Sequence, residues 1–240
     1  MKKILLLIIL VSTIALNSCT EEDSAGVSRV TTYATMTLKG AENLFWPINT
    51  AFVDPGCVAM QGTTDISSKI AATSNVDAKT GGKYTINYKV ANSDGFYATT
   101  SRTVYVYDPN STLNGYYTSN ISRTTTTTGV VGPRGPYTIL VYGVGGSNFA
   151  VEDLMGGWYY YGSAYGITYA SLGILKLNSD NTLSIVKSYS TAFSSASACV
   201  FYDAGSNYDP ATKTLVLHTS MGDTPKYQFN VTMNNPTPLN

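Results

Sequence analysis

The chain has 240 residues, of which only 12% are charged, and 15 basic residues balance 15 acidic ones. Charged residues make up about a quarter of an ordinary globular protein, so this surface is expected to be unusually neutral. Without a long run of either sign, the composition argues against nucleic acid or an anionic bilayer surface as partner. With 21 glycines and abundant β-branched residues, the chain favours short strands over long helices.

Residues 1–18 have the pattern of a secretory signal peptide. Lys2 and Lys3 precede an almost unbroken apolar run from Ile4 to Leu16. A cationic start followed by roughly 7–15 apolar residues is typical of such leaders, and a membrane span needs roughly 20. We therefore predict that the chain is exported.

The end of this leader, Leu16-Asn17-Ser18-Cys19, resembles the lipobox of bacterial lipoproteins. In that family the leader is cut before the cysteine, and the cysteine carries the lipid. The resemblance implies a lipidated Cys19 as the first residue of the mature protein, and two or three acyl chains anchor a protein stably. The alternative is a plain secretory leader that ends in cysteine.

Residues 19–27 form a short polar tether. Glu21, Glu22 and Asp23 follow Cys19 closely. This acidic group resembles the export signal of Bacteroidetes lipoproteins, which implies an outer-membrane protein that faces the cell exterior. The alternatives are a tether that is merely hydrophilic and an anchor in the inner leaflet.

Residues 28–108 change to short alternating runs separated by turn residues. Tyr84, Ile86, Tyr88 and Val90 share one face of a predicted strand, and Asp94-Gly95 predicts a type I′ hairpin after it. The return strand runs from Phe96 to Tyr107. Its valines, Val104 and Val106, point one way, and its tyrosines, Tyr105 and Tyr107, point the other.

Several motifs in this segment look like the bacterial immunoglobulin-like module of Bacteroidetes surface proteins. The resemblance implies a β-sandwich that acts as a spacer or a binding platform. The matching pieces are Asp54-Pro55-Gly56, Val76-Asp77, Gly82-x-Tyr84-Thr85-Ile86-x-Tyr88, Asp94-Gly95 and Ser101-Arg102-Thr103-Val104-x-Val106.

Residues 113–236, after a linker at Ser111-Thr112, hold about nine more short predicted strands. This pattern indicates an antiparallel β-barrel or sandwich, so the predicted fold class is all-β throughout. We expect a loop at Gly132-Pro133-Arg134-Gly135-Pro136 and a strand at Trp158-Tyr159-Tyr160-Tyr161.

Two motifs resemble the β-rich domain of unknown function that follows such an Ig-like module in Bacteroidetes lipoproteins. That family implies an architecture and a location but no activity. The motifs are Leu113-Asn114-Gly115-Tyr116 and Phe149-x-Val151-x-Asp153-x-x-Gly156-Gly157-x-Tyr159.

Histidine and cysteine are too few for the commonest catalytic and metal sites. His218 is the only histidine and lies in a predicted strand, where a structural role is expected. Cys57 and Cys199 are far apart, and we expect them to be buried thiols rather than a disulfide. We predict no zinc site and no cofactor.

Carboxylates offer little more. Glu152 and Asp153 are neighbours on a predicted strand and should point to opposite faces, which excludes a facing acid pair. Asp203 and Asp209 are typical of turn chemistry, although a converging pair stays open. Two clusters contain possible calcium ligands, although each offers few: Asn92, Asp94 and Asp108, and Asp203, Asn207 and Asp209.

Aromatic side chains are the best indication of function. Exposed rings beside hydroxyl and amide groups suit flat, weakly polar partners such as sugars or another protein. We predict Trp158, Tyr160, Tyr165 and Tyr169 as the ligand-binding residues. The predicted protein is a lipid-anchored, non-catalytic binding module for glycan or protein. The alternatives are a subunit of an outer-membrane or adhesive assembly, and a glycan hydrolase.

Overall fold

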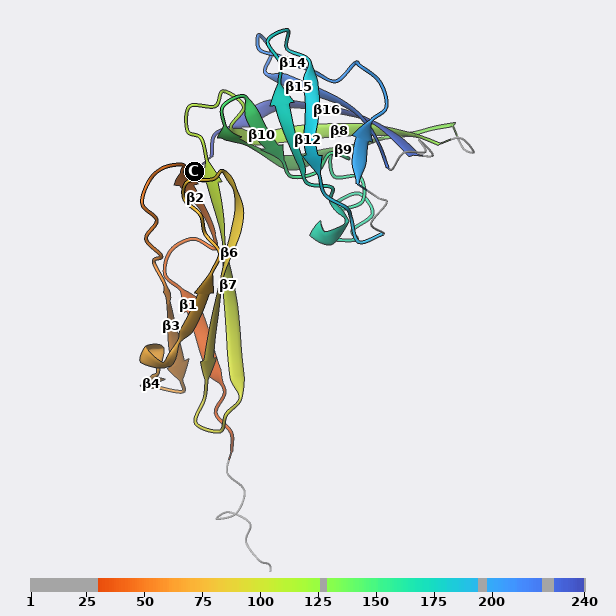
Figure 1. The fold of residues 1–240 in the computed structure, drawn as a ribbon. Helices are drawn as coiled ribbons and strands as arrows, with labels where there is room; N and C mark the ends of the chain where they lie inside the picture. Colours follow the sequence, from red (N-terminus) through yellow and green to blue (C-terminus); the bar gives the residue numbers. More distant parts are fainter. Residues whose placement is uncertain (1–29, 126–128, 194–197, 222–226, 240) are drawn as a thin grey trace, which may run out of the picture.

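The computed structural model describes residues 30–125, 129–193, 198–221 and 227–239. Within these ranges the regular secondary structure is almost entirely β-strand, arranged as an elongated first domain and a second domain set at an angle across its end (Figure 1). No helix in the described part is long and apolar enough to cross a membrane. The predictions for the leader, Cys19 and the acidic tether lie outside the described residues.

The first domain is the predicted immunoglobulin-like sandwich. One of its sheets has the strand order β1-β3-β4 and the other β2-β7-β6-β5, with β2 parallel to β7. A single turn of 3₁₀-helix, η2 (Ser67–Lys69), precedes β5. The strands are β1 (Ala34–Leu38), β2 (Asn43–Pro47), β3 (Cys57–Gln61), β4 (Thr64–Asp65), β5 (Ala71–Ser74), β6 (Gly82–Ala91) and β7 (Tyr97–Tyr107).

The alternating pattern of β6 and β7 fixes which face of this sheet is core. Ile86, Tyr88, Val104 and Val106 are at most 1% exposed, as the period of two predicts. The hairpin between the strands is present, but it is not the expected type I′ turn. Asn92 closes it instead, because its side-chain oxygen accepts the backbone N–H groups of Asp94 and Phe96 at 3.0 and 2.8 Å.

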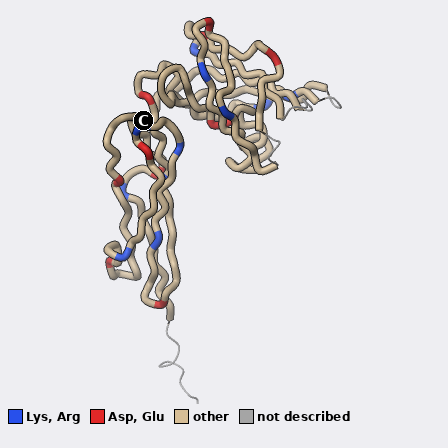
Figure 2. Tube along the Cα trace, viewed as in Figure 1, with Lys and Arg blue, Asp and Glu red and all other residues tan. Residues whose placement is uncertain are grey.

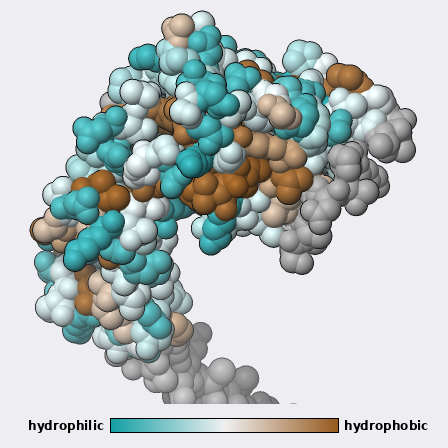
Figure 3. Space-filling view, turned by 45° about the horizontal axis from the view of Figure 1, so that its top comes forward, coloured by the Kyte–Doolittle hydropathy of each residue, from teal (hydrophilic) through white to brown (hydrophobic). Residues whose placement is uncertain are grey.

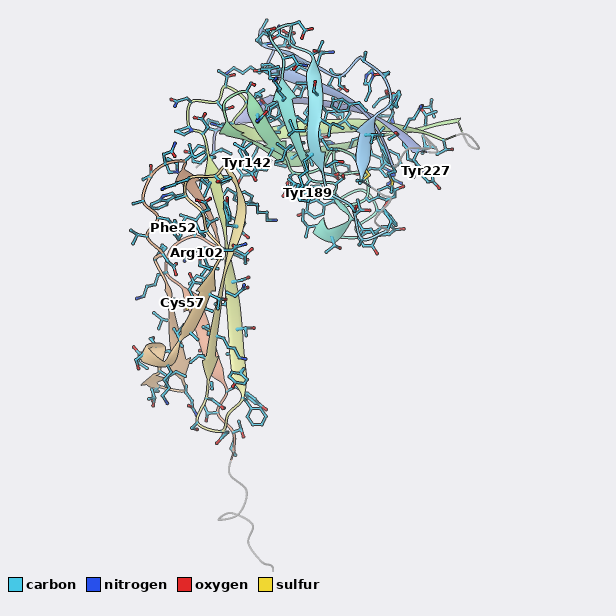
Figure 4. The ribbon with its side chains drawn as sticks, viewed as in Figure 1. Phe52, Cys57, Arg102, Tyr142, Tyr189 and Tyr227 are labelled. Carbon is cyan, nitrogen blue, oxygen red and sulfur yellow. The ribbon has the colours of Figure 1, made fainter. Side chains whose placement is uncertain are left out.

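An ion pair with a buried arginine joins three of the motifs that indicated the sandwich. Arg102 is fully buried, and its guanidinium lies 3.1 Å from the carboxylate of Asp54. The hydroxyl of Tyr88 donates to the same carboxylate at 2.6 Å, and Arg102 also donates to the carbonyls of Lys39 and Ala41. Burial of a charge is tolerated where it is paired and hydrogen-bonded, so these motif residues are structural. Figure 4 labels Arg102 in the interior of the first domain.

The second domain is one strongly curved antiparallel sheet, with the order β12-β11-β10-β9-β8-β16-β15-β13 and β14 beside β15. Its two ends nearly meet: the backbone N–H of Leu183 donates to the carbonyl of Ser206 at 3.0 Å. The sheet is therefore a nearly closed barrel. Its strands are β8 (Gly115–Thr125), β9 (Gly129–Gly145), β10 (Asn148–Val151), β11 (Gly173–Leu177), β12 (Leu183–Ser188), β13 (Cys199–Phe201), β14 (Asn207–Asp209), β15 (Thr214–Met221) and β16 (Tyr227–Thr237).

The predicted loop at residues 132–136 is wrong, because β9 runs through it. Prolines are excluded from strands chiefly because they lack a donor for a neighbouring strand. Here β8 pairs with one edge of this segment, while β10 begins to pair only at Val141. The other edge of residues 129–136 therefore has no strand partner in the described part of the chain, and register shifts opposite Ser119, Ile121 and Arg123 accommodate the glycines.

The two domains meet through a shared aromatic cluster rather than a loose linker. The outward-facing tyrosines of β7, Tyr105 and Tyr107, pack with Phe45 of the first domain and Tyr142 and Tyr116 of the second. The residues between the domains are also hydrogen-bonded, since the backbone of Asp108 donates to the carbonyl of Gly143 at 2.8 Å. The predicted Ser111-Thr112 linker is thus part of an ordered junction.

Candidate functional site

The predicted ligand-binding residues lie in a long excursion between β10 and β11, residues 152–172, which carries one turn of 3₁₀-helix, η3 (Ile167–Tyr169). Asp153 closes the base of this loop. Its carboxylate accepts the backbone N–H groups of Met155 at 3.0 Å and Gly157 at 2.9 Å on one side and of Ser171 at 3.0 Å on the other. One fully buried side chain therefore holds both ends of the loop together.

Burial of Asp153 has a clear electrostatic consequence. Removal from water disfavours the charged form and raises the pKa of this carboxyl to about 7, although the three backbone donors oppose the shift. The folded protein therefore holds a proton on Asp153 at pH values where an exposed aspartate has lost it.

The predicted strand at Trp158-Tyr159-Tyr160-Tyr161 is wrong, because these residues form turns. Gly156 and Gly157, immediately before them, have φ of +64° and +98°. This left-handed backbone turns the chain and prevents it from continuing as an extended strand. The rings consequently do not alternate between two faces of a sheet.

Trp158 is also not a surface residue. It is 1% exposed and packs inside the barrel with Phe229, with ring centroids 6.1 Å apart. Two guanidinium groups lie over its ring, those of Arg134 at 4.1 Å and Arg123 at 4.8 Å from the centroid. Cation–π contacts of this kind stabilise a buried aromatic ring, so Trp158 anchors the loop and is unavailable to a ligand.

Tyr165 and Tyr169 do reach the surface, and they do so together. Tyr165 is 54% exposed, and its centroid lies 5.2 Å from that of the half-buried Tyr169. Phe193, which is 43% exposed, packs 4.7 Å from Tyr169 and 4.8 Å from the buried Tyr159. We call Tyr165, Tyr169 and Phe193, seated on Tyr159, the aromatic platform.

Tyr160 belongs to a separate stack on the other side of the loop. It is half-buried and lies 3.9 Å from Tyr161, which in turn stacks on Tyr137 at 5.6 Å. Of the four predicted ligand-binding residues, Tyr165 and Tyr169 lie together at the surface. Trp158 is buried in the core, and Tyr160 lies in the separate stack with Tyr161 and Tyr137.

A cavity of about 120 Å³ lies at the junction of the two domains, beneath this loop. Lys83 and Tyr105 line it from the first domain, and Tyr142 and Glu152 line it from the second. Ile167 and Ala170, at the start of η3 and just after its end, close one wall. Figure 4 labels Tyr142 at this junction, and Figure 3 shows hydrophobic side chains gathered on the second domain beside the first.

Glu152 is the polar centre of the cavity. Burial raises the pKa of its carboxyl, while a hydrogen bond from the backbone of Leu140 and the positive charge of Lys83 oppose the shift. Asp153 points away into the barrel wall, so the two neighbouring carboxylates serve different sites. The sequence did not indicate the cavity, because its lining comes from strands and loops that are far apart in the chain.

The remaining candidates do not assemble into sites. His218 lies 2.8 Å from the carboxylate of Asp203, so this histidine has a partner that the sequence did not reveal. Asp209 is used by its own turn, where it accepts the backbone N–H of Ala211 at 2.9 Å. Within the described ranges no three His, Cys, Asp or Glu side chains gather where they could hold a metal ion. Cys57 and Cys199 are both free and buried.

The fold and these motifs define a two-domain, all-β protein with an immunoglobulin-like first domain. A family model described as the Ig-like domain of bacterial surface proteins matches residues 36–106, and a C-terminal domain model matches residues 106–235. The crystal structure of the lipoprotein BT2262 from Bacteroides thetaiotaomicron has 29% identity and a TM-score of 0.64, covering 85% of this chain and 100% of that one. The chain therefore belongs to the family with a BT2262-like C-terminal domain, as the predicted resemblance implied.

Two other solved structures are more distant, and both come from Clostridium perfringens ZmpB. The M60 catalytic domain with CBM51-1 and CBM51-2 has 24% identity and a TM-score of 0.27, covering 49% of this chain and 15% of that one. CBM51-2 in complex with GlcNAc and INT domains has 16% identity and a TM-score of 0.28, covering 84% and 43%. TM-scores this low carry no argument about a ligand. No curated protein matches the chain.

Proposed function

We propose that this protein is a lipid-anchored, non-catalytic binding module of the outer membrane that recognises glycan outside the cell. The lipid sits on Cys19, the acidic tether directs export, and the Ig-like domain is the spacer. The second domain contacts the glycan through the aromatic platform.

The platform carries this proposal. Tyr165 and Phe193 expose 54% and 43% of their surface, while contacts with Tyr169 and Tyr159 hold them in place. Rings that are already ordered lose little conformational entropy when a partner binds. Sugars present weakly polar C–H faces that suit such rings, and the sparse, mixed charges of both domains (Figure 2) favour a neutral partner.

The arrangement of carboxylates supports recognition rather than hydrolysis. Glycosidases generally need two carboxyl groups about 5–9.5 Å apart across the scissile bond. Among the described residues that line the interdomain cavity, Glu152 is the one carboxylate.

Binding of the purified full chain, in detergent, to a glycan array tests the proposal. We expect saturable binding to a restricted set of glycans that weakens about tenfold in Tyr165→Ala, because one ring contact is worth up to about 1.5 kcal/mol. The matched control is Tyr97→Ala, since Tyr97 is 66% exposed on the first domain. Absence of glycan binding, together with co-purification of a membrane protein, would favour the assembly subunit instead.

A further inference from the structure

The cavity between the domains presents two opposite charges that do not pair with each other. Lys83 comes from β6 of the first domain and Glu152 follows β10 of the second. Each lies within electrostatic range of the other, since the charge of Lys83 lowers the pKa of Glu152. However, the ion pairs of the described residues do not include this one.

Glu152 has spare hydrogen-bonding capacity. Its Oε2 atom accepts one long bond, 3.4 Å, from the backbone N–H of Leu140. Within the described part of the chain, Oε1 accepts no bond from the protein. The Oε1 atom can therefore accept a hydrogen bond from water or from a ligand in the cavity.

The other walls are amphipathic. Tyr105 and Tyr142 pack edge to face with centroids 5.4 Å apart, and Ile167 and Ala170 close the far side. A volume of about 120 Å³ exceeds one water molecule and is below the roughly 300–1,000 Å³ of a site for a drug-sized ligand. The cavity therefore suits one small ligand with both polar and apolar faces.

The charges select among such ligands. A simple cation would be attracted by Glu152 and repelled by Lys83, and a simple anion the reverse. A hydroxyl group both donates and accepts hydrogen bonds. Neighbouring hydroxyls can therefore donate to the carboxylate of Glu152 and accept from the ammonium group of Lys83.

We propose that the interdomain cavity binds a single sugar residue, whose hydroxyls bridge Glu152 and Lys83 while its C–H face lies against Tyr105 and Ile167. This inference rests on the proposed function for the class of ligand. It adds a second contact point, separate from the platform and shared by both domains. Ile167 of η3 and the next residue after η3, Ala170, line the cavity, while Tyr169 of η3 belongs to the platform, so one loop supports both.

Saturation-transfer NMR on the full chain in detergent, with glucose, galactose, mannose and N-acetylglucosamine at millimolar concentration, tests the cavity. We expect at least one sugar to bind. Glu152→Gln should weaken binding at least fivefold, because a bond to a charged acceptor is about twice as strong as a neutral one. Ala170→Leu should abolish binding by filling the space.

Glu152→Gln and Ala170→Leu change partly buried residues and could lose binding because they fold poorly. Lys83→Met avoids this ambiguity, because Lys83 is exposed and its replacement should not unfold the chain. It should weaken binding at least fivefold, whereas Lys176→Met, an exposed lysine on β11, should change nothing. Unchanged binding in Lys83→Met and Ala170→Leu overturns the cavity site. The cavity site is also overturned if none of the four sugars shows saturation transfer, or if an amino acid added as a comparison is the one ligand that does.

The same variants on the glycan array separate the two proposals. Array binding that weakens in Tyr165→Ala but not in Ala170→Leu leaves the proposed function standing and overturns the cavity. Array binding that is lost in Ala170→Leu but unchanged in Tyr165→Ala supports the cavity and overturns the platform as the glycan contact. A wild-type chain that binds no glycan in either assay overturns both.

Discussion

Asp153, whose carboxylate accepts three backbone N–H groups and so joins the two ends of the loop at residues 152–172, predicts an unusual pH dependence of stability. We call this arrangement the clasp. In the unfolded chain this carboxyl has an ordinary pKa near 3.8, and burial raises it to about 7 in the folded protein. Between these values the folded state holds a proton that the unfolded state has released, so stability falls as pH rises. A shift of about three pKa units corresponds to about 4 kcal/mol, at about 1.36 kcal/mol per unit.

Asp153→Asn removes this titration but keeps the shape of the side chain. The amide retains one acceptor oxygen and places an N–H₂ group against one of the backbone donors, which costs about 1–3 kcal/mol for a buried unpaired group. We therefore expect the variant to be less stable than the wild type at pH 4. Its disadvantage should shrink or reverse as pH rises to 7.

Urea unfolding followed by tryptophan fluorescence measures this difference. The chain has two tryptophans, so a Trp46→Phe background leaves Trp158 as the reporter of the second domain. Glu152 also has a raised pKa, but it is present in both chains and its contribution cancels. A difference in unfolding free energy that stays constant from pH 4 to 7, or grows, would refute the buried clasp.

Three further substitutions test the packing, and two of them have a comparison variant at an exposed or open position. Arg102→Met should cost about 1–3 kcal/mol of stability, because the carbonyls of Lys39 and Ala41 and the carboxylate of Asp54 lose their side-chain donor. Gly156→Ala should cost clearly more than Gly95→Ala, for which about 1–2 kcal/mol is expected, because a Cβ at Gly156 would lie 2.5 Å from a side-chain atom while Gly95 is open. Trp158→Ala should cost about 3–5 kcal/mol, and Tyr165→Ala less than about 0.5. Thermal and urea unfolding check each, and equal losses within either pair would contradict the structure.

The sequence predicted most strands, because a period of two is a local signal. The alternation in residues 84–90 and 104–107 identified the core face of the first domain, and the opposite face of β7 proved to be the domain junction. In the second domain, the turn-rich sequence around β14 (Asn207–Asp209) concealed that strand.

The errors arise where tertiary contacts override local chemistry. Glycine and proline at 132–136 would exclude a strand only if both edges of the segment had to donate backbone hydrogen bonds to neighbouring strands. Here one edge has no neighbouring strand in the described part of the chain, so it needs no donors. The aromatic run from Trp158 to Tyr161 has strand propensity, but two left-handed glycines and the clasp at Asp153 turn it into a loop. The juxtaposition of Lys83 and Glu152 depends on how two domains pack, which no local pattern encodes.

Whole cells test the central claim most directly. Cells that express the wild-type chain, Cys19→Ala or Tyr165→Ala are stained with an antibody against the second domain and with a fluorescent form of a glycan bound on the array. We predict that wild-type cells retain both labels, that Tyr165→Ala cells retain only the antibody, and that Cys19→Ala cells retain neither. Wild-type cells that display the antibody label but no glycan, or Cys19→Ala cells that keep both labels, would contradict the account.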